Sequence, residues 1–151
     1  MKLFAHRGNF EGPSVHENAL HHVDKALIAG FDVEIDLRCM VGTINDLYLG
    51  HDFYDYPVVP SWLLERSDSL LVHAKDVQAL HRALELELHC FWHGEDDFTL
   101  TSRGFIVTYP GRHLDTTSRS IVMSRDVQEQ RTIFDRGEAY GICSDFIGQL
   151  K

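Results

Sequence analysis

The sequence predicts an α/β fold built on a largely parallel sheet with crossover helices. Short apolar runs typical of strands alternate with segments whose apolar residues recur at helical spacing, and this alternation implies parallel strands joined by helices. Polar residues such as His6, Glu34 and His73 stand near the carboxyl ends of the strand-like runs. In parallel α/β sheets that edge carries the functional site, so the same pattern predicts both the fold and the place of the site.

In the first half of the chain, strands and helices are expected to alternate. Apolar residues at helical spacing predict a helix over 17–29, and alternating apolar and charged residues predict a strand over 31–40. Asp76 is a suitable N-cap for the helix that follows it. The other elements expected here are a short helix over 62–66 and strands over 3–5, 47–50 and 70–75.

In the second half of the chain, the gaps between strands are too short for full helices, so fewer helices are expected. One helix is predicted over 127–134, ended by Gly137. Tyr109 is interpreted as a core residue, and the stretch 92–97 fits the rim of a site and a solvated acidic loop equally well. The expected strands cover 89–93, 105–109, 120–123 and 140–143.

Length and composition are those of a soluble globular protein. The 151 residues fit one domain, residues 1–151, and 44% of them are hydrophobic. The net charge of −9 argues against nucleic acid or an anionic membrane as partner, because both need a basic face. No run reaches the roughly 20 apolar residues of a membrane span, and no signal peptide is recognisable. Three widely spaced cysteines indicate buried thiols in a reducing cytoplasm, which is the expected location.

Two carboxylates on one strand face suggest a metal site. Glu34 and Asp36 are two residues apart, so both side chains point to the same side of the strand. Buried together they would repel each other unless a cation neutralised them, and a divalent ion with oxygen ligands does so. The alternative is a solvated strand face, which is the commoner origin of an isolated pair of this kind.

Further polar residues stand at the same predicted edge. His73 and Lys75 repeat the two-residue spacing on the next strand, where His73 suits a third metal ligand and Lys75 suits a phosphate. Two histidines in loops, His6 and His51, suit acid–base chemistry at a phosphodiester, and Arg7 offers a bidentate fork to phosphate oxygens. Taken singly, His73 and Lys75 are better explained as ordinary surface or hydrogen-bonded residues. With ten histidines in the chain, a pair such as His6 and His51 is easily a coincidence.

An ordered set of short motifs resembles the glycerophosphodiester phosphodiesterase family. That family has a TIM-type barrel and belongs to a wider group that includes phosphatidylinositol-specific phospholipase C and the spider sphingomyelinases. The resemblance covers residues 3 to about 76, residues 140–145 look like the closing strand, and 92–111 are similar to a stretch in short relatives from bacterial surface-polysaccharide gene neighbourhoods. The motifs are Ala5-His6-Arg7-Gly8, Glu17-Asn18, Glu34-Ile35-Asp36-Leu37, Gly50-His51-Asp52 and Lys75.

The resemblance implies a role for each matching residue. It implies that His6 and His51 are the catalytic acid and base, and that Glu34 and Asp36 bind one divalent ion, Mg²⁺ or Ca²⁺. The substrate-binding residues that it implies are Arg7, Asn18 and Lys75.

The chain departs from the family pattern in three ways. His16 and Ala19 flank the Glu17-Asn18 pair where the family usually has Pro and Thr. His73 stands in place of a third carboxylate ligand, which widens the choice of metal toward Mn²⁺ or Zn²⁺. A TIM barrel has about 250 residues, roughly 100 more than this chain. A reduced barrel of about seven core strands is therefore expected, open on one side or covered by a second copy in a homo-oligomer.

Two functions follow from these observations. The first is a metal-dependent phosphodiester hydrolase whose substrate is a small phosphodiester, such as a glycerophosphodiester, or a phospho-glycan. The second is a non-catalytic module that binds a phosphate or phospho-glycan and has lost turnover. The retained histidine pair favours the enzyme, since binding alone needs no acid–base pair, whereas His73 and the shortened barrel favour the binding module. A purely structural protein does not account for the ordered motifs.

Overall fold

The computed structural model describes residues 1–40, 42, 46–111 and 116–151. The strands are β1 (Lys2–His6), β2 (Asp32–Cys39), β3 (Leu47–Leu49), β4 (Tyr56–Val58), β5 (Leu70–Ala74), β6 (Cys90–Phe91), β7 (Phe98–Leu100), β8 (Ile106–Thr108), β9 (Ser120–Met123) and β10 (Gly141–Ser144). The helices are α1 (Leu20–Ile28), α2 (Pro60–Glu65), α3 (Val77–Glu85), α4 (Val127–Arg136) and the final 3₁₀ turn η1 (Ile147–Leu150).

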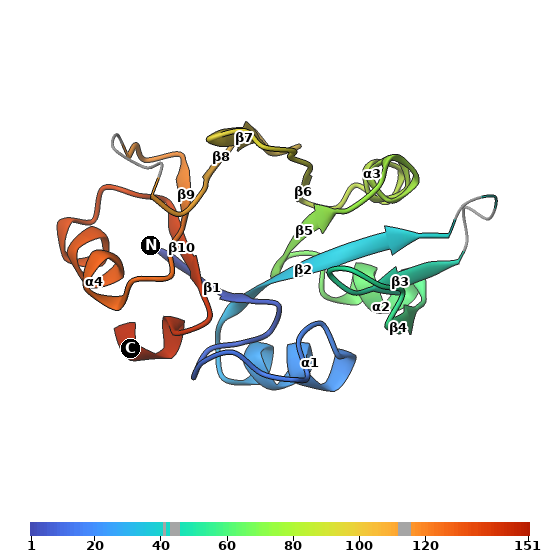
Figure 1. Ribbon diagram of the computed structural model, residues 1–151, viewed down its shortest axis with the longest axis horizontal. Helices are drawn as coiled ribbons and strands as arrows, with labels where there is room; N and C mark the ends of the chain where they lie inside the picture. Colours follow the sequence, from blue (N-terminus) through green and yellow to red (C-terminus); the bar gives the residue numbers. More distant parts are fainter. Residues whose placement is uncertain (41, 43–45, 112–115) are drawn as a thin grey trace.

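A curved sheet of parallel strands forms the body of the protein (Figure 1). The parallel pairs run in the order β6-β5-β2-β1-β10-β9-β8. Antiparallel strands extend it at two places: β3 and β4 continue from the distal half of β2, and β7 pairs with β8. The predicted α/β class is confirmed, with seven parallel strands and, among the described residues after α3, only one full helix, α4.

The sheet does not close on itself within the described residues. No ladder joins β6 to β7 or β8 there. A loop bridges part of the gap, because the Ser102 amide donates to the Cys90 carbonyl at 2.8 Å and the Cys90 amide donates to Ser102 Oγ at 3.0 Å. The structure therefore shows an open, strongly curved sheet, and it does not confirm the expected reduced TIM-type barrel.

The helices cover the outer, convex face of the curved sheet. The side chains of β2 alternate between this outer face and the inner, concave face. Val33, Ile35 and Leu37 are fully buried in the main core, which also includes residues of α1 and α3. Because side chains alternate along a strand, their neighbours Glu34 and Asp36 point the other way, to the inner side of the curved sheet. A second, smaller apolar cluster lies on this inner side and forms the floor below the strand ends; it consists of Phe4, Leu71, Phe91, Val107, Ile121, Met123 and Cys143.

Local signals predicted several helix ends. Asp76 caps α3 by accepting a hydrogen bond from the Ala79 amide at 2.7 Å, and Gly137 ends α4 in the left-handed conformation with φ of 65°. The start predicted for the first helix was wrong: α1 begins at Leu20, because Asn18 adopts a positive φ of 64° and turns its side chain to Asp36.

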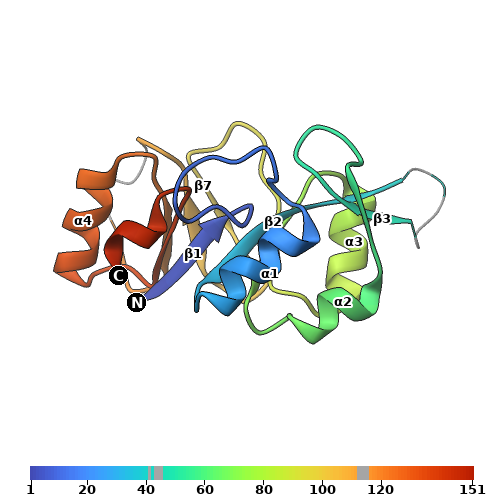
Figure 2. The same ribbon diagram turned by 90° about the horizontal axis from the view of Figure 1, so that it is seen from below.

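The ends of the chain lie close together, and helices α1 and α4 flank them (Figure 2). The three cysteines are free and buried, as expected. No helix in the described part of the chain is both long and apolar enough to cross a lipid bilayer.

A buried histidine beside the open edge makes stability depend on pH. His89 is 6% exposed, contacts Thr101 Oγ1 at 2.9 Å, and burial lowers its pKa to about 4. Because an unfolded histidine takes up its proton near pH 6.5, the folded state should lose about 2 kcal/mol between pH 7.5 and pH 5 from this group. Urea midpoints at both pH values measure the loss. The urea midpoint of His89→Gln should fall less between pH 7.5 and pH 5 than that of the wild type. Equal falls of the two midpoints would contradict the prediction.

Candidate active site

The residues predicted to form a site converge at the carboxyl ends of three neighbouring strands. β1, β2 and β5 are adjacent in the sheet and parallel, so the residues that end them meet at one edge. The predicted residues that interact directly there are His6, Arg7, Asn18, Glu34, Asp36, His73 and Lys75. His51 is the one predicted site residue that stands apart from this group.

Glu34, Asp36 and His73 form a compact buried cluster. The two carboxylates are 1% and 0% exposed on the inner face of β2, and His73 faces them from β5. His73 Nδ1 lies 3.2 Å from Asp36 Oδ1 and 3.8 Å from Glu34 Oε1. One ligand atom from each residue lies within 4.8 Å of the others, which is a spacing that one metal ion can bridge.

The second oxygen of Asp36 is held by a reciprocal contact with Asn18. The Asn18 amide group donates to Asp36 Oδ2 at 3.0 Å, and the Asp36 backbone amide donates to Asn18 Oδ1 at 2.9 Å. Arg7 Nε lies 3.0 Å from the same Oδ2, and Lys75 Nζ lies 3.6 Å from Oδ1. Oδ1 is buried and accepts no aligned hydrogen bond from any described residue. An unsatisfied, buried carboxylate oxygen that faces Glu34 and His73 fits a metal ligand.

The electrostatics of the cluster also fit a cation. Burial and the charge of Asp36 raise the pKa of Glu34 to about 7. Burial opposes ionisation of Asp36 as well, but the His73 ring, Arg7 and Asn18 outweigh it and hold the pKa of Asp36 well below its usual range. Burial lowers the pKa of His73 below 6.5, so its ring is neutral at pH 7, as metal ligation requires. Near neutral pH a bound cation would compete with the proton on Glu34.

His6 is oriented by a carboxylate that the sequence did not assign. His6 Nδ1 lies 2.8 Å from Asp145 Oδ1, and Asn9 donates to the same oxygen at 2.9 Å. Burial would lower the pKa of His6, but the hydrogen bond to Asp145 and the charge of Glu34 raise it above 6.5. The other ring nitrogen, Nε2, lies 3.9 Å from Glu34 Oε2 and faces the cluster. The available signal in the sequence was the position of Asp145 directly after β10, because functional residues gather at the carboxyl ends of parallel strands.

Arg7 is held between two carboxylates. Its Nη1 donates to Glu17 Oε2 at 2.9 Å, and its Nε lies 3.0 Å from Asp36 Oδ2. The backbone has a positive φ of 54°, which costs energy for a residue with a side chain and is typical of functional sites. At the following Gly8, a Cβ would come within 2.9 Å of the His22 ring, so only glycine fits this turn. The guanidinium charge is thus largely neutralised within the protein.

His51 lies on the far side of Arg7 from His6. It is 39% exposed, and its Nδ1 lies 2.8 Å from Asp52 Oδ1. His51 lines one hollow with Phe53 and Asn18, whereas His6 lines a separate cavity, and Arg7 borders both. Among the described residues, the two histidines therefore flank the buried cluster and make no direct contact.

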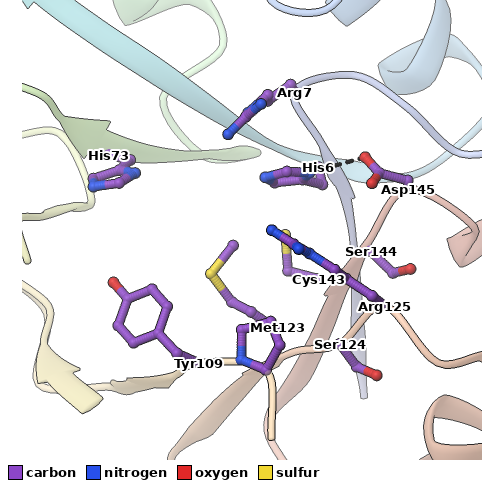
Figure 3. A pocket seen from close by; sticks show the side chains of 11 residues that line it. His6, Arg7, His73, Tyr109, Met123, Ser124, Arg125, Cys143, Ser144 and Asp145 are labelled. Carbon is purple, nitrogen blue, oxygen red and sulfur yellow. Dashed lines mark hydrogen bonds and ion pairs between the residues drawn. The ribbon is translucent and has the colours of Figure 1, made fainter. Parts of the chain in front are cut away.

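The cavity beside His6 contains further residues that the sequence did not assign to a site (Figure 3). Tyr109, predicted as core, lines its wall, and its ring stacks on His93 at 3.7 Å between centroids. His93 stacks in turn on His73 at 5.0 Å, so an aromatic column runs from Tyr109 to the buried cluster. The other cavity residues missed by the sequence are Pro110, Met123, Ser124, Arg125, Cys143 and Ser144. In the sequence, the signal that could have indicated these residues was again their position at or just after the end of a strand.

Comparison with known proteins shows similarity at the level of the fold. No family model and no curated protein matches this sequence. Among solved structures, the chain is similar to a phosphodiesterase from Oleispira antarctica that was determined in complex with its product, sn-glycerol-3-phosphate. The TM-score is 0.56 with 15% sequence identity, over 99% of this chain and 95% of the other. At this identity the similarity shows the mixed α/β fold alone.

Proposed function

We propose that this protein is a divalent-metal-dependent phosphodiester hydrolase that resembles the glycerophosphodiester phosphodiesterases. The observation that carries the proposal is the buried Glu34, Asp36 and His73 cluster with the His6–Asp145 pair directly beside it. The buried Glu34 carboxylate is unfavourable in the folded protein without a cation, because burial and the charge of Asp36 raise its pKa, so a need to hold the sheet together does not explain it. On this proposal the open sheet is a TIM-type barrel reduced to seven parallel strands.

Glu34, Asp36 and His73 would hold the metal ion. Two carboxylates suit Mg²⁺ or Ca²⁺, and the imidazole extends the choice to Mn²⁺ or Zn²⁺. A bound divalent ion would polarise a phosphoryl oxygen and stabilise negative charge in the transition state. Asn18, Arg7 and Lys75 fix the orientation of Asp36 through the contacts described above. Arg7 borders both hollows at the site, and on this proposal Arg7 and Lys75 contact the phosphate.

The two histidines would divide the proton transfers. Because the pKa of His6 is raised, more of it carries a proton near neutral pH, and we assign it as the acid that protonates the leaving alkoxide. Asp145 keeps the ring in place and favours its charged form, as an orienting carboxylate does in other acid–base pairs. His51, on the other side of Arg7, is then the base that deprotonates water or a substrate hydroxyl.

The substrate is a small phosphodiester. The fold neighbour was solved with sn-glycerol-3-phosphate as its product, which makes a glycerophosphodiester the first substrate to test. A phospho-glycan presents the same group, a phosphate between two alcohols, and remains the second substrate class on this proposal.

A binding module is the second candidate, and one observation favours it. His6 and His51 line different hollows, so a single small ligand has to reach around Arg7 to meet both rings. In a protein that only binds phosphate, the ligand does not have to contact both histidines.

Hydrolysis of an aryl phosphodiester and of a glycerophosphodiester tests the choice between the two. Purified protein is assayed with Mg²⁺, Ca²⁺, Mn²⁺ or Zn²⁺ and with a chelator. The enzyme proposal expects turnover that the chelator abolishes and that His51→Ala lowers about a hundredfold or more. His81→Ala, an exposed histidine on α3, is the matched control and should keep full activity. Turnover that survives the chelator would contradict the metal requirement, and absence of turnover with every metal and both substrates would favour the binding module.

A further inference from the structure

Arg125 is a cation at the edge of the cavity that neither the sequence motifs nor the proposed chemistry uses. It lies between β9 and α4, at the same edge of the sheet as His6, and it lines the cavity together with His6, Tyr109 and Met123. Its side chain extends across the cavity and points its guanidinium group toward His6 (Figure 3).

The other cations at this edge already have carboxylate partners. Arg7 is held by Glu17 and Asp36, and Lys75 lies 3.6 Å from Asp36. Arg125, in contrast, makes no ion pair or hydrogen bond with any residue of the described chain. In a protein with a net charge of −9, this leaves a guanidinium group that faces a cavity and has no charge partner among the residues that the structure describes.

The neighbouring helix start does not compete for an anion. Asp126 caps α4 by accepting hydrogen bonds from the Gln128 and Glu129 amides, so the helix already has its negative group. The Ser124 hydroxyl is likewise engaged, with the Glu129 carboxylate and the Asp126 carbonyl. The Arg125 side chain is therefore the group that this loop presents to a ligand.

We propose that Arg125 binds the phosphate group of the ligand and holds it against His6. A guanidinium group matches phosphate with two parallel hydrogen bonds, and water in the open part of the cavity would otherwise solvate it. The inference deepens the proposed function, on which it rests: the phosphate would lie with the buried Glu34 and Asp36 on one side and Arg125 on the other, and its leaving oxygen would meet His6. Arg125 would then bind the phosphate in addition to Arg7, whose charge is already largely neutralised by Glu17 and Asp36.

Phosphate binding by the intact protein tests this assignment directly. Inorganic phosphate and dimethyl phosphate are titrated into wild type, Arg125→Gln and Arg136→Gln, with heat as the readout. Arg136→Gln removes the same charge at the other end of α4, about 15 Å away, and serves as the control. Arg125→Gln should weaken phosphate binding at least tenfold, Arg125→Lys should restore part of it, and Arg136→Gln should leave the Kd unchanged. Circular dichroism establishes that each variant is folded.

The outcomes separate this inference from the proposed function. A loss for inorganic phosphate alone assigns Arg125 to the monoester product, and a loss for both probes assigns it to substrate and product. If Arg125→Gln weakens phosphate binding while the wild type hydrolyses no diester, the inference stands and the enzyme proposal fails. If the wild type does not bind phosphate at millimolar concentration, or if Arg125→Gln binds it as tightly as wild type does, the inference is overturned even in an active enzyme. In an active enzyme, Arg125→Gln should raise KM more than it lowers kcat.

Discussion

Replacing His6 by alanine is expected to lower phosphodiester turnover at least about a hundredfold while the protein stays folded. The side chain is only partly exposed, its Nε2 faces the Glu34 and Asp36 cluster, and its raised pKa keeps the acid form populated near neutral pH. Alanine removes the proton donor and leaves Asp145 with its hydrogen bond from Asn9, so the carboxylate does not lose all its partners.

The kcat of His6→Ala, compared with that of His81→Ala, measures this effect. Melting curves of both variants separate a loss of chemistry from a loss of fold. The Asp145→Asn variant adds a second measurement, the pH dependence of activity, which would not change if His6 had only a structural role. Without the Asp145 charge the pKa of His6 falls, so the pH at which activity declines on the alkaline side should shift to lower values. A His6→Ala protein with normal turnover would exclude the proposed acid.

Replacing Glu34 by glutamine is expected to abolish both turnover and stabilisation by metal. Glu34 is 1% exposed, and burial together with the charge of Asp36 raises its pKa to about 7. A raised carboxyl pKa means that the folded protein loses stability as the pH rises from about 4.5 through 7, because the group must then ionise while buried. Without metal, Glu34→Gln should therefore be more stable than wild type at pH 8, although it is inactive.

Melting temperatures with and without Mn²⁺ measure both parts of this prediction. An ion at one hundred times its Kd stabilises the folded state by about 2.7 kcal/mol, which is about 5–10 °C for a domain of this size. The shift should be larger at pH 8 than at pH 6, because the ion competes with the proton on Glu34. Glu138→Gln, an exposed change on the loop after α4, should keep the full shift. A metal-induced shift that persists in Glu34→Gln would show that the ion binds elsewhere.

Features that depend on near neighbours in the chain could be predicted from the sequence. The alternation of Val33, Ile35 and Leu37 with charged residues predicted β2 and its two faces, since successive side chains of a strand must point to opposite sides. Asp76 and Gly137 predicted helix ends for the same reason, because capping is a local interaction. The two-residue spacing of Glu34 and Asp36 predicted that the carboxylates share a side, and the structure adds that both are buried.

Features that depend on distant segments were decided by the tertiary structure alone. The contact between His6 and Asp145 joins residues 139 positions apart, and no local pattern specifies such a pair. The open edge beside β6, the short strands β4 and β7, and the placement of His51 in a separate hollow also follow from how the sheet curves. The lack of a partner for the Arg125 guanidinium group among the described residues also became apparent only from the tertiary structure. The sequence by itself therefore determined the local elements and which reactive side chains the protein carries. The packing of segments that are distant in the sequence decided which of these side chains meet.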